Sequence, residues 1–358
     1  MCIQRKKEKD VRTTDAPIKK EEEEHVKYEL VPRKEAGTEL YANIVTAENR
    51  CSPFWVMGPN VVDVKWVWDH QVKEMFYGDD PYWSEKFNKI PNDQGMRYAS
   101  DANPDKNREG MPPCQDDGRV ILNYPGLKSD YIHANFVGTQ KNPKRFIATQ
   151  SPTEHTEHAF WAMIIQEQVS KIVVMDTEAP DYFYPYWHYP NEIRRIGETP
   201  NTIVIVNSDE IVHMNETKFG TKVTPKFRNE AGITQIRMLV QWGADKSVDI
   251  FKITKWMPEY FDCQLVELML TVWNNQHPVV VHCGSGVGYT GTFVAIACLH
   301  ENMSRGNTYG YDVIQTIREL RQQRYKMVLL EEHGEWIIKA ITFLLDYKCG
   351  YKSDYFVY

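Results

Sequence analysis

The sequence lacks the features that would place it in a membrane, among disulfide-bonded secreted proteins or on a nucleic acid. No stretch reaches the roughly 18 apolar residues that span a bilayer, and the charged first residues contain no apolar signal region. The seven cysteines are odd in number and have no paired spacing, which favours free thiols in a reducing compartment. A net charge of -7 leaves no domain-wide basic excess to neutralise a phosphate backbone. We therefore expect a cytoplasmic protein with no membrane span and no nucleic-acid partner.

Composition divides the 358 residues into one large domain and two tails. Residues 1–45 are dense in Lys, Glu and Asp, contain few apolar residues and show no clear period, so we predict a disordered charged tail. The chain as a whole is 42% hydrophobic, which is enough to bury a substantial core. We predict a single domain over residues 46–350 and a short C-terminal tail over residues 351–358.

The most informative stretch runs from Pro278 to Gly291, where an apolar strand leads into a glycine-rich loop and then into a helical stretch from Thr292 to Asn302. Closely spaced glycines let a loop curl so that successive backbone N–H groups point inward, and the positive N-terminal end of the helix adds to the effect. The stretch therefore predicts a cradle for an anion such as phosphate. Cys283, at the base of this loop, is a candidate nucleophile.

These residues resemble the signature of the protein tyrosine phosphatases, in which His and Cys are followed by five residues, an arginine and a Ser or Thr. The resemblance covers about residues 60–345. It implies an α/β fold with a twisted mixed β-sheet flanked by helices on both faces. Tyr289 stands where the family has its arginine, so one neutral hydroxyl replaces a guanidinium that would grip two phosphoryl oxygens. The phosphate loop implied by the resemblance, here vestigial, consists of Cys283, Gly284, Ser285, Gly286, Val287, Gly288, Tyr289 and Thr290.

The pocket rim implied by the resemblance is also altered. Glu109 follows Arg108 where active relatives carry a tyrosine that stacks on the substrate ring, and Leu329 replaces the glutamine that positions water. No Trp-Pro-Asp is present: in one alignment Pro258 replaces the general acid, and in another Glu259 replaces it on a longer arm. The expected rim residues are Arg108, Glu109, Trp256, Glu259 and Leu329.

These substitutions predict that the chain is not an enzyme. Loss of a general acid costs about 10²–10⁴ in rate, and loss of one donor to transition-state charge costs about 10²–10³. The product leaves Cys283 roughly 10⁴–10⁷ slower than in a working phosphatase. We expect no catalytic residues and no cofactor. His155 and His158 have no cysteine or carboxylate partner at ligand spacing, so we also expect no metal.

The sequence leaves three functions open. The favoured one is a pseudophosphatase that regulates signalling by binding a protein partner, with a tyrosine-phosphorylated kinase segment as the leading candidate. The pattern of losses is similar to that of nematode oocyte antiphosphatases, which hold a kinase inactive at the cell cortex. The alternatives are a phosphorylation-independent scaffold that uses another face of the fold, and a weak active phosphatase. For a binding protein, we expect the surface around Arg108, Arg321 and Arg324 to contribute affinity.

Overall fold

The computed structural model describes residues 82–175, 183–187, 193–198, 201–213, 232–242, 244–257, 260–261, 263–273, 275–304 and 312–349. All of them belong to one unit of the chain, residues 43–358. The two predicted tails, residues 1–45 and 351–358, lie outside the described residues, and so does Glu259.

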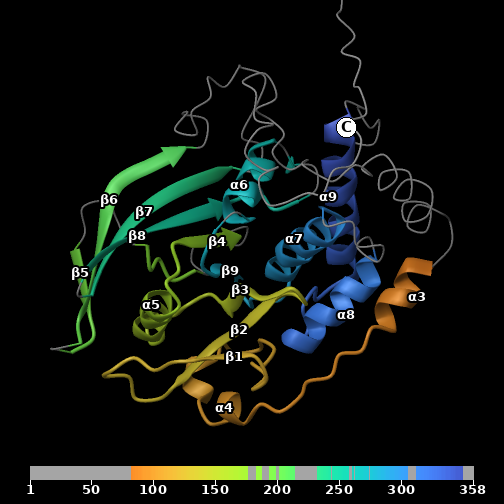
Figure 1. The fold of residues 1–358 in the computed structure, drawn as a ribbon. Coiled ribbons are helices and arrows are strands. Elements are labelled where there is room, and N and C mark those ends of the chain that lie inside the picture. The colour runs from red at the N-terminus through yellow and green to blue at the C-terminus, as the bar shows by residue number, and fades with distance from the viewer. Residues whose placement is uncertain are drawn as a thin grey trace, which may run out of the picture. The chain divides into compact units, whose positions relative to one another are not determined.

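The described strands form one mixed sheet (Figure 1). Its spatial order is β1-β2-β3-β9-β4-β8-β7-β6-β5. The neighbours β3 and β9, β9 and β4, and β4 and β8 run parallel, whereas the pairs on either side of them are antiparallel. The strands are β1 (Arg119–Ile121), β2 (Tyr131–Thr139), β3 (Asn142–Gln150), β4 (Lys171–Met175), β5 (Ile193–Ile196), β6 (Ile203–His213), β7 (Ile233–Trp242), β8 (Ala244–Ile253) and β9 (Val279–Cys283).

Helices cover both faces of this sheet, which confirms the predicted fold class (Figure 1). One face packs on α5 (Glu157–Gln166). The other face packs on α6 (Cys263–Trp273), α7 (Tyr289–Ser304), α8 (Val313–Gln323) and α9 (Glu331–Cys349), with α3 (Tyr82–Asn88) joining the same core. The short helix α4 (Tyr98–Asp101) and a 3₁₀ turn, Pro104–Lys106, precede β1.

The strand β9 lies in the parallel centre of the sheet and is buried on both faces. Val279 and Val281 point into the core with α7 and α9, whereas Val280 points into the core with α5. A strand that is covered on both sides has to be apolar at successive positions, which explains its continuous run of valines. The alternation of side chains along the strand then fixes where its last residue, Cys283, points.

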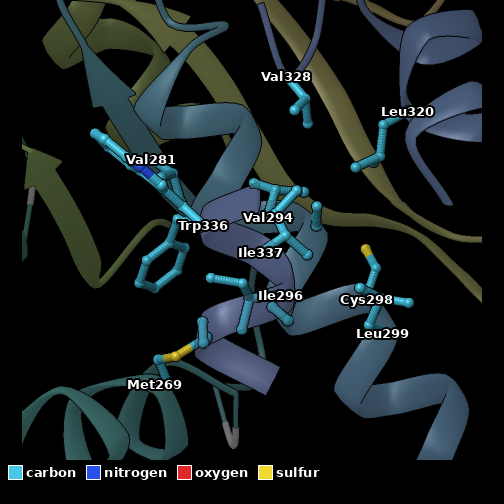
Figure 2. Close-up of a cluster of buried hydrophobic side chains, with 14 of the residues drawn as sticks. Met269, Val281, Val294, Ile296, Cys298, Leu299, Leu320, Val328, Trp336 and Ile337 are labelled. Carbon is cyan, nitrogen blue, oxygen red and sulfur yellow. The ribbon is translucent and has the colours of Figure 1, made fainter. Parts of the chain in front are cut away.

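The helix α7 is enclosed by its neighbours, and Figure 2 shows the side chains that meet there. Val294, Ile296 and Leu299 are all at most 1% exposed. A helix that is apolar around most of its circumference belongs in an interior rather than on a surface. The residues that meet this helix come from four other segments and include Met269, Val281, Leu320, Trp336 and Ile337. The loop between β9 and α7 is therefore anchored at both ends in the core.

Among the described residues, no helix is both long enough and apolar enough to cross a membrane.

Candidate functional site

The predicted strand, loop and helix form as expected, although the helix begins earlier than Thr292. The strand β9 ends at Cys283, residues 284–288 form the loop, and α7 begins at Tyr289. The Cys283 thiol is 4% exposed. The Thr290 hydroxyl donates a hydrogen bond to Cys283 Sγ at 3.3 Å, and Ser285 Oγ lies 4.0 Å from the same sulfur. The residue types that would serve a thiolate nucleophile are thus close together at the base of the loop.

Two glycines are required by close contacts of the loop with its surroundings. Gly286 has a φ of +71°, and a Cβ atom there would lie 2.0 Å from the Thr149 carbonyl oxygen. At Gly291, a Cβ atom would lie 2.3 Å from the backbone nitrogen of Val328. Because neither neighbour is a flexible side chain, no other residue fits at these positions without a shift of the backbone. The loop is therefore held between the end of β3 and the segment before α9.

The loop is held by its carbonyl groups, four of which accept hydrogen bonds in succession. The Gly284 carbonyl accepts from Ser151 N–H at 3.0 Å, and the Val287 carbonyl accepts from Val328 N–H at 2.9 Å. Between them, the carbonyls of Ser285 and Gly286 both accept from the guanidinium of Arg324, at 3.4 Å and 2.9 Å. A peptide group is planar and trans, so each N–H points opposite to the preceding C=O. The N–H groups of residues 285–288 consequently face away from the protein framework.

Most of these N–H groups have no partner in the part of the chain that the structure describes. Val287 N–H donates to Ser285 Oγ at 3.4 Å. No atom of the described residues accepts from the N–H groups of Ser285, Gly286 or Gly288. Neighbouring free N–H groups at the start of a long helix form a binding site for an anion. This geometry matches the predicted phosphate cradle.

Arg324 is buried, which corrects the expectation that it lies at a binding surface. It is 1% exposed, and burial lowers the pKa of its guanidinium. Besides the loop carbonyls, it donates to Asn135 Oδ1 at 2.7 Å and contacts His133 Nδ1 at 3.1 Å. A buried charge is tolerated only when its donors find partners in this way. Arg324 therefore fixes the shape of the loop from its carbonyl side.

Arg321 is buried as well and has a similar structural role. It is 4% exposed. Its guanidinium donates to the carbonyls of Ile90, Met327 and Val328, each at 3.1 Å. The surface that we expected around Arg321 and Arg324 is therefore wrong, because both side chains point into the protein. Both are exceptions to the usual exposure of arginine in folded proteins.

Tyr289 packs against α9. Its ring stacks on Trp336 with centroids 5.5 Å apart and an angle of 16° between the planes. His333 contacts the same ring edge-on at 5.3 Å, and both α9 residues are 6% exposed. Aromatic pairs of this kind add roughly 0.5–1.5 kcal/mol beyond the burial of their area. The tyrosine at the position of the family's arginine thus has a packing role of its own.

The residues expected at the pocket rim differ in where they lie. Arg108 is half-buried, and its Nε donates to the Ser151 carbonyl at 2.9 Å. Glu109 is exposed, and Leu329 is half-buried against the core. Trp256 has an exposed fraction of 0%, so its ring does not line a rim. It packs between Phe261 and Phe293, at centroid distances of 5.2 Å and 5.8 Å.

Sequence reasoning missed several residues that support the cradle. His282 is fully buried, and its Nε2 lies 2.7 Å from the Tyr186 hydroxyl. Burial lowers the pKa of His282 to about 3, so this ring is neutral at physiological pH. Nothing in the sequence indicated the contacts of Tyr186, Asn135 and His133, because their partners are remote in the chain. Among the described residues, no group of three His, Cys, Asp or Glu side chains could hold a metal ion.

A cysteine at the end of a central parallel strand, below an anion cradle that opens a buried helix, defines a phosphatase-like site on an α/β sheet. The comparisons with known proteins agree. Residues 103–343 match the sequence model of the family described as protein-tyrosine phosphatase. The chain belongs to this family.

Several curated relatives carry phosphatase names. The chain is 30% identical to the human receptor-type tyrosine-protein phosphatase epsilon over 297 residues, which is 75% of this chain and 39% of that protein. It is 27% identical to the Lar-like tyrosine-protein phosphatase of Caenorhabditis elegans over 76% of this chain and 12% of that protein. It is 28% identical to tyrosine phosphatase H3 of Microplitis demolitor bracovirus over 67% of this chain and 80% of that protein. The chain thus spans well under half the length of the first two relatives.

Replacing Arg324 should destabilise the protein strongly. In Arg324→Met, the carbonyls of Ser285 and Gly286 lose their donor, and the Asn135 amide oxygen keeps only the Cys114 thiol, 3.3 Å away. Each unpaired buried group costs about 1–3 kcal/mol, so we expect the free energy of unfolding to fall by about 2–6 kcal/mol in urea denaturation.

Arg318 lies on α8, the helix that ends just before Arg324, and it is exposed, so it provides the matched control. Arg318→Met should change the value by less than about 0.5 kcal/mol, and equal effects of the two changes would contradict the role of Arg324.

Three buried histidines should make the protein sensitive to acid. Burial lowers the pKa of His133 and His282 to about 3 and that of His333 to about 4, from an ordinary value of 6.5. Below pH 6.5 these histidines become protonated in the unfolded chain but stay neutral in the folded chain. The free energy of unfolding therefore falls as the pH drops toward 4. Each histidine contributes up to about 1.4 kcal/mol per pH unit.

The measurement is the free energy of unfolding between pH 7 and pH 4. His333→Phe keeps an aromatic ring and removes one titrating group, so the slope should decrease by about 1.4 kcal/mol per pH unit. His155→Asn replaces an exposed histidine that lies outside this buried group and serves as the control for the substitution itself. A His333→Phe protein with the original slope would show that His333 takes up its proton equally well in the folded state.

Proposed function

We propose that this chain is a pseudophosphatase: a tyrosine-phosphatase-like domain without turnover that regulates signalling by binding a partner. The partner we propose is a tyrosine-phosphorylated protein such as a kinase activation segment. By the resemblance to nematode oocyte antiphosphatases, binding takes place in the cytoplasm, with the cell cortex as the site of action. The observation that supports the proposal best is the placement of Tyr289, which occupies the arginine position and is engaged by α9.

Two positions lack the chemistry that catalysis needs. A phosphoryl group in transit needs positive charge around its oxygens, which a family arginine supplies by two parallel hydrogen bonds. The ring of Tyr289 stacks on Trp336 and carries no charge. At Leu329, an apolar side chain replaces a glutamine, and such a side chain cannot orient a water molecule. Cys283 and Thr290 alone leave the nucleophile without its electrostatic partners.

The geometry of the loop favours binding over a phosphorylation-independent scaffold. The unpaired N–H groups of Ser285, Gly286 and Gly288 face away from the framework that holds their neighbouring carbonyls. Unpaired donors are costly where they are shielded from water, and an anion offsets that cost. A domain that used only a distant face would have no need to keep three such donors. The phosphorylation-independent scaffold remains the alternative, and the titration described below distinguishes it from phosphotyrosine binding.

We predict no measurable hydrolysis of a phosphotyrosine peptide or of a small aryl phosphate by the unmodified chain. The charge that stabilises the transition state is missing, together with the glutamine that positions water. The assay compares the chain with Cys283→Ser at equal concentration, because any background that survives this change comes from a contaminant. Turnover that depends on Cys283 would contradict the proposal.

Restoring the guanidinium tests what Tyr289 has replaced. A hydrogen bond to a charged group contributes about 1.5–3 kcal/mol, so Tyr289→Arg should bind a phosphotyrosine peptide roughly ten- to a few-hundredfold more tightly than the unmodified chain. Tyr289→Phe keeps the aromatic packing and should bind as the unmodified chain does. Both are measured by calorimetric titration. The rate should stay low in Tyr289→Arg, and a large gain in rate would mean that Glu259 acts as a general acid.

The same titration separates the two binding functions. A partner segment is offered with and without a phosphate on its tyrosine. We expect the phosphorylated form to bind more tightly, and free phosphotyrosine to displace it poorly, because the surface around the cradle supplies most of the affinity. Equal affinity for the two forms would favour the scaffold, and displacement by low micromolar phosphotyrosine would mean that the pocket alone carries the binding.

A further inference from the structure

We propose that α3, which lies before the residues matched by the family, is a positioning element of the anion cradle, with Trp83 as its anchor. The family match begins at residue 103, whereas α3 spans Tyr82–Asn88. Two separate sets of contacts connect this helix and Ile90 to the loop. The regulatory meaning of this connection rests on the proposed binding function, but the connection itself is tested without a ligand.

The first set of contacts joins α3 to the start of α9. The Trp83 ring lies directly on the backbone of α9, since a Cβ atom at Gly334 would come within 2.0 Å of Trp83 Cζ2. The Trp83 indole N–H donates to the Glu331 carbonyl at 3.4 Å, and the Ser84 hydroxyl donates to Glu331 Oε2 at 3.0 Å. Glycine is unfavourable in a helix interior, so its presence at 334 is explained by the room that the indole needs.

The same two turns of α9 touch the cradle on their other side. His333 and Trp336 contact the Tyr289 ring, and they also contact each other with centroids 5.4 Å apart. A Cβ atom at Gly288 would lie 2.9 Å from His333 Cε1, so this imidazole presses on the loop backbone itself. A shift of α9 at Gly334 therefore moves the residues that hold Gly288 and Tyr289.

The second set of contacts runs through Arg321. Its guanidinium lies over the Phe87 ring at 4.8 Å and donates to the Ile90 carbonyl, and it also donates to the carbonyls of Met327 and Val328. Val328 has a φ of +58°, which is unusual for a β-branched residue and persists only where the surroundings enforce it. Val328 N–H donates in turn to the Val287 carbonyl in the loop. The strained residue thus connects Arg321 to the cradle.

Both routes reach the C-terminal end of the loop, one at Val287 and the other at Gly288 and Tyr289. If α3 moves away from α9, the Trp83 indole no longer packs on Gly334. Arg321 then loses its contacts with the Ile90 carbonyl and the Phe87 ring. The donors of residues 285–288 should then become less ordered. Because coupling between two sites is reciprocal, an anion in the cradle should also hold α3 more firmly in place.

The decisive variant is Gly334→Ala in the full chain, studied by native-state hydrogen exchange. Helix propensity alone favours alanine at this position, so a protein in which Trp83 needs no room should become more stable. We expect the opposite: the amides that are hydrogen-bonded to the loop carbonyls, those of Thr292 and Val328, should exchange about tenfold faster, while amides of β4 and β8 keep their rates. In Trp83→Ala, the additional change Gly334→Ala should have no further effect on the cradle, because the ring that clashes is gone.

Two further variants keep the test decisive. Ser84→Ala removes one hydrogen bond to Glu331 and should speed cradle exchange about two- to tenfold, so it replaces Gly334→Ala if the latter fails to fold. Glu335→Ala changes an exposed residue in the same turn of α9 and should exchange like the unmodified chain. Unchanged cradle exchange in the variants of α3 and Gly334, or an equal increase in β4 and β8, would overturn the proposal.

A last arm adds a phosphotyrosine peptide to the unmodified chain. Slower exchange in α3 on binding is expected from the coupling, and binding that leaves α3 unchanged would overturn it. If the unmodified chain binds no such peptide, the proposed binding function fails, whereas the comparison of ligand-free variants still decides whether α3 positions the cradle.

Discussion

The cradle depends on one buried guanidinium. Arg324 is 1% exposed and joins α8 to β2 through Asn135 and His133, and to the loop through the carbonyls of Ser285 and Gly286. A buried cation is unfavourable unless nearly all of its donors are used, so this side chain accepts few other arrangements of its neighbours. By fixing two carbonyls, it also fixes the opposite orientation of the next two N–H groups. The shape of the loop is therefore set by the protein framework and needs no ligand.

The residues that hold the loop in shape do not include the residue at position 289, where the family's arginine would supply charge. The residue at position 289 contributes nothing to the bonds that hold the carbonyls of residues 284–287. An arginine can be replaced there by a tyrosine without releasing the cradle, provided that the new side chain finds a place. Trp336 and His333 provide that place, and the stack of Tyr289 on Trp336 stabilises the start of α7. Loss of charge at this position and retention of the loop are compatible for this physical reason.

The sequence predicted those parts of the structure whose cause is local. The valine run of β9 and the glycines after it have a pattern that only a covered strand or a tight loop explains. The roles of Arg321 and Arg324 could not be predicted, because their partners are remote: Arg324 and Asn135 are 189 positions apart. Charge favours an exposed location on average, and only the three-dimensional contacts reveal the exception. Trp256 was also misplaced at the rim, because the sequence does not show that Phe261 and Phe293 pack against its ring.

In a preorganised site, the free-energy cost of orienting the donors falls on the folded protein and not on the binding step. The donors of Ser285, Gly286 and Gly288 are oriented before a ligand arrives, so little conformational entropy is lost on binding. The cost is visible elsewhere: Val328 has an unfavourable backbone conformation, and Arg321 and Arg324 are buried. Interactions far from the ligand, including those of Ile90 and Trp83, maintain these features. In the binding function that we propose, affinity for an anion is therefore governed by the framework as a whole, and it can change through residues that never touch the ligand.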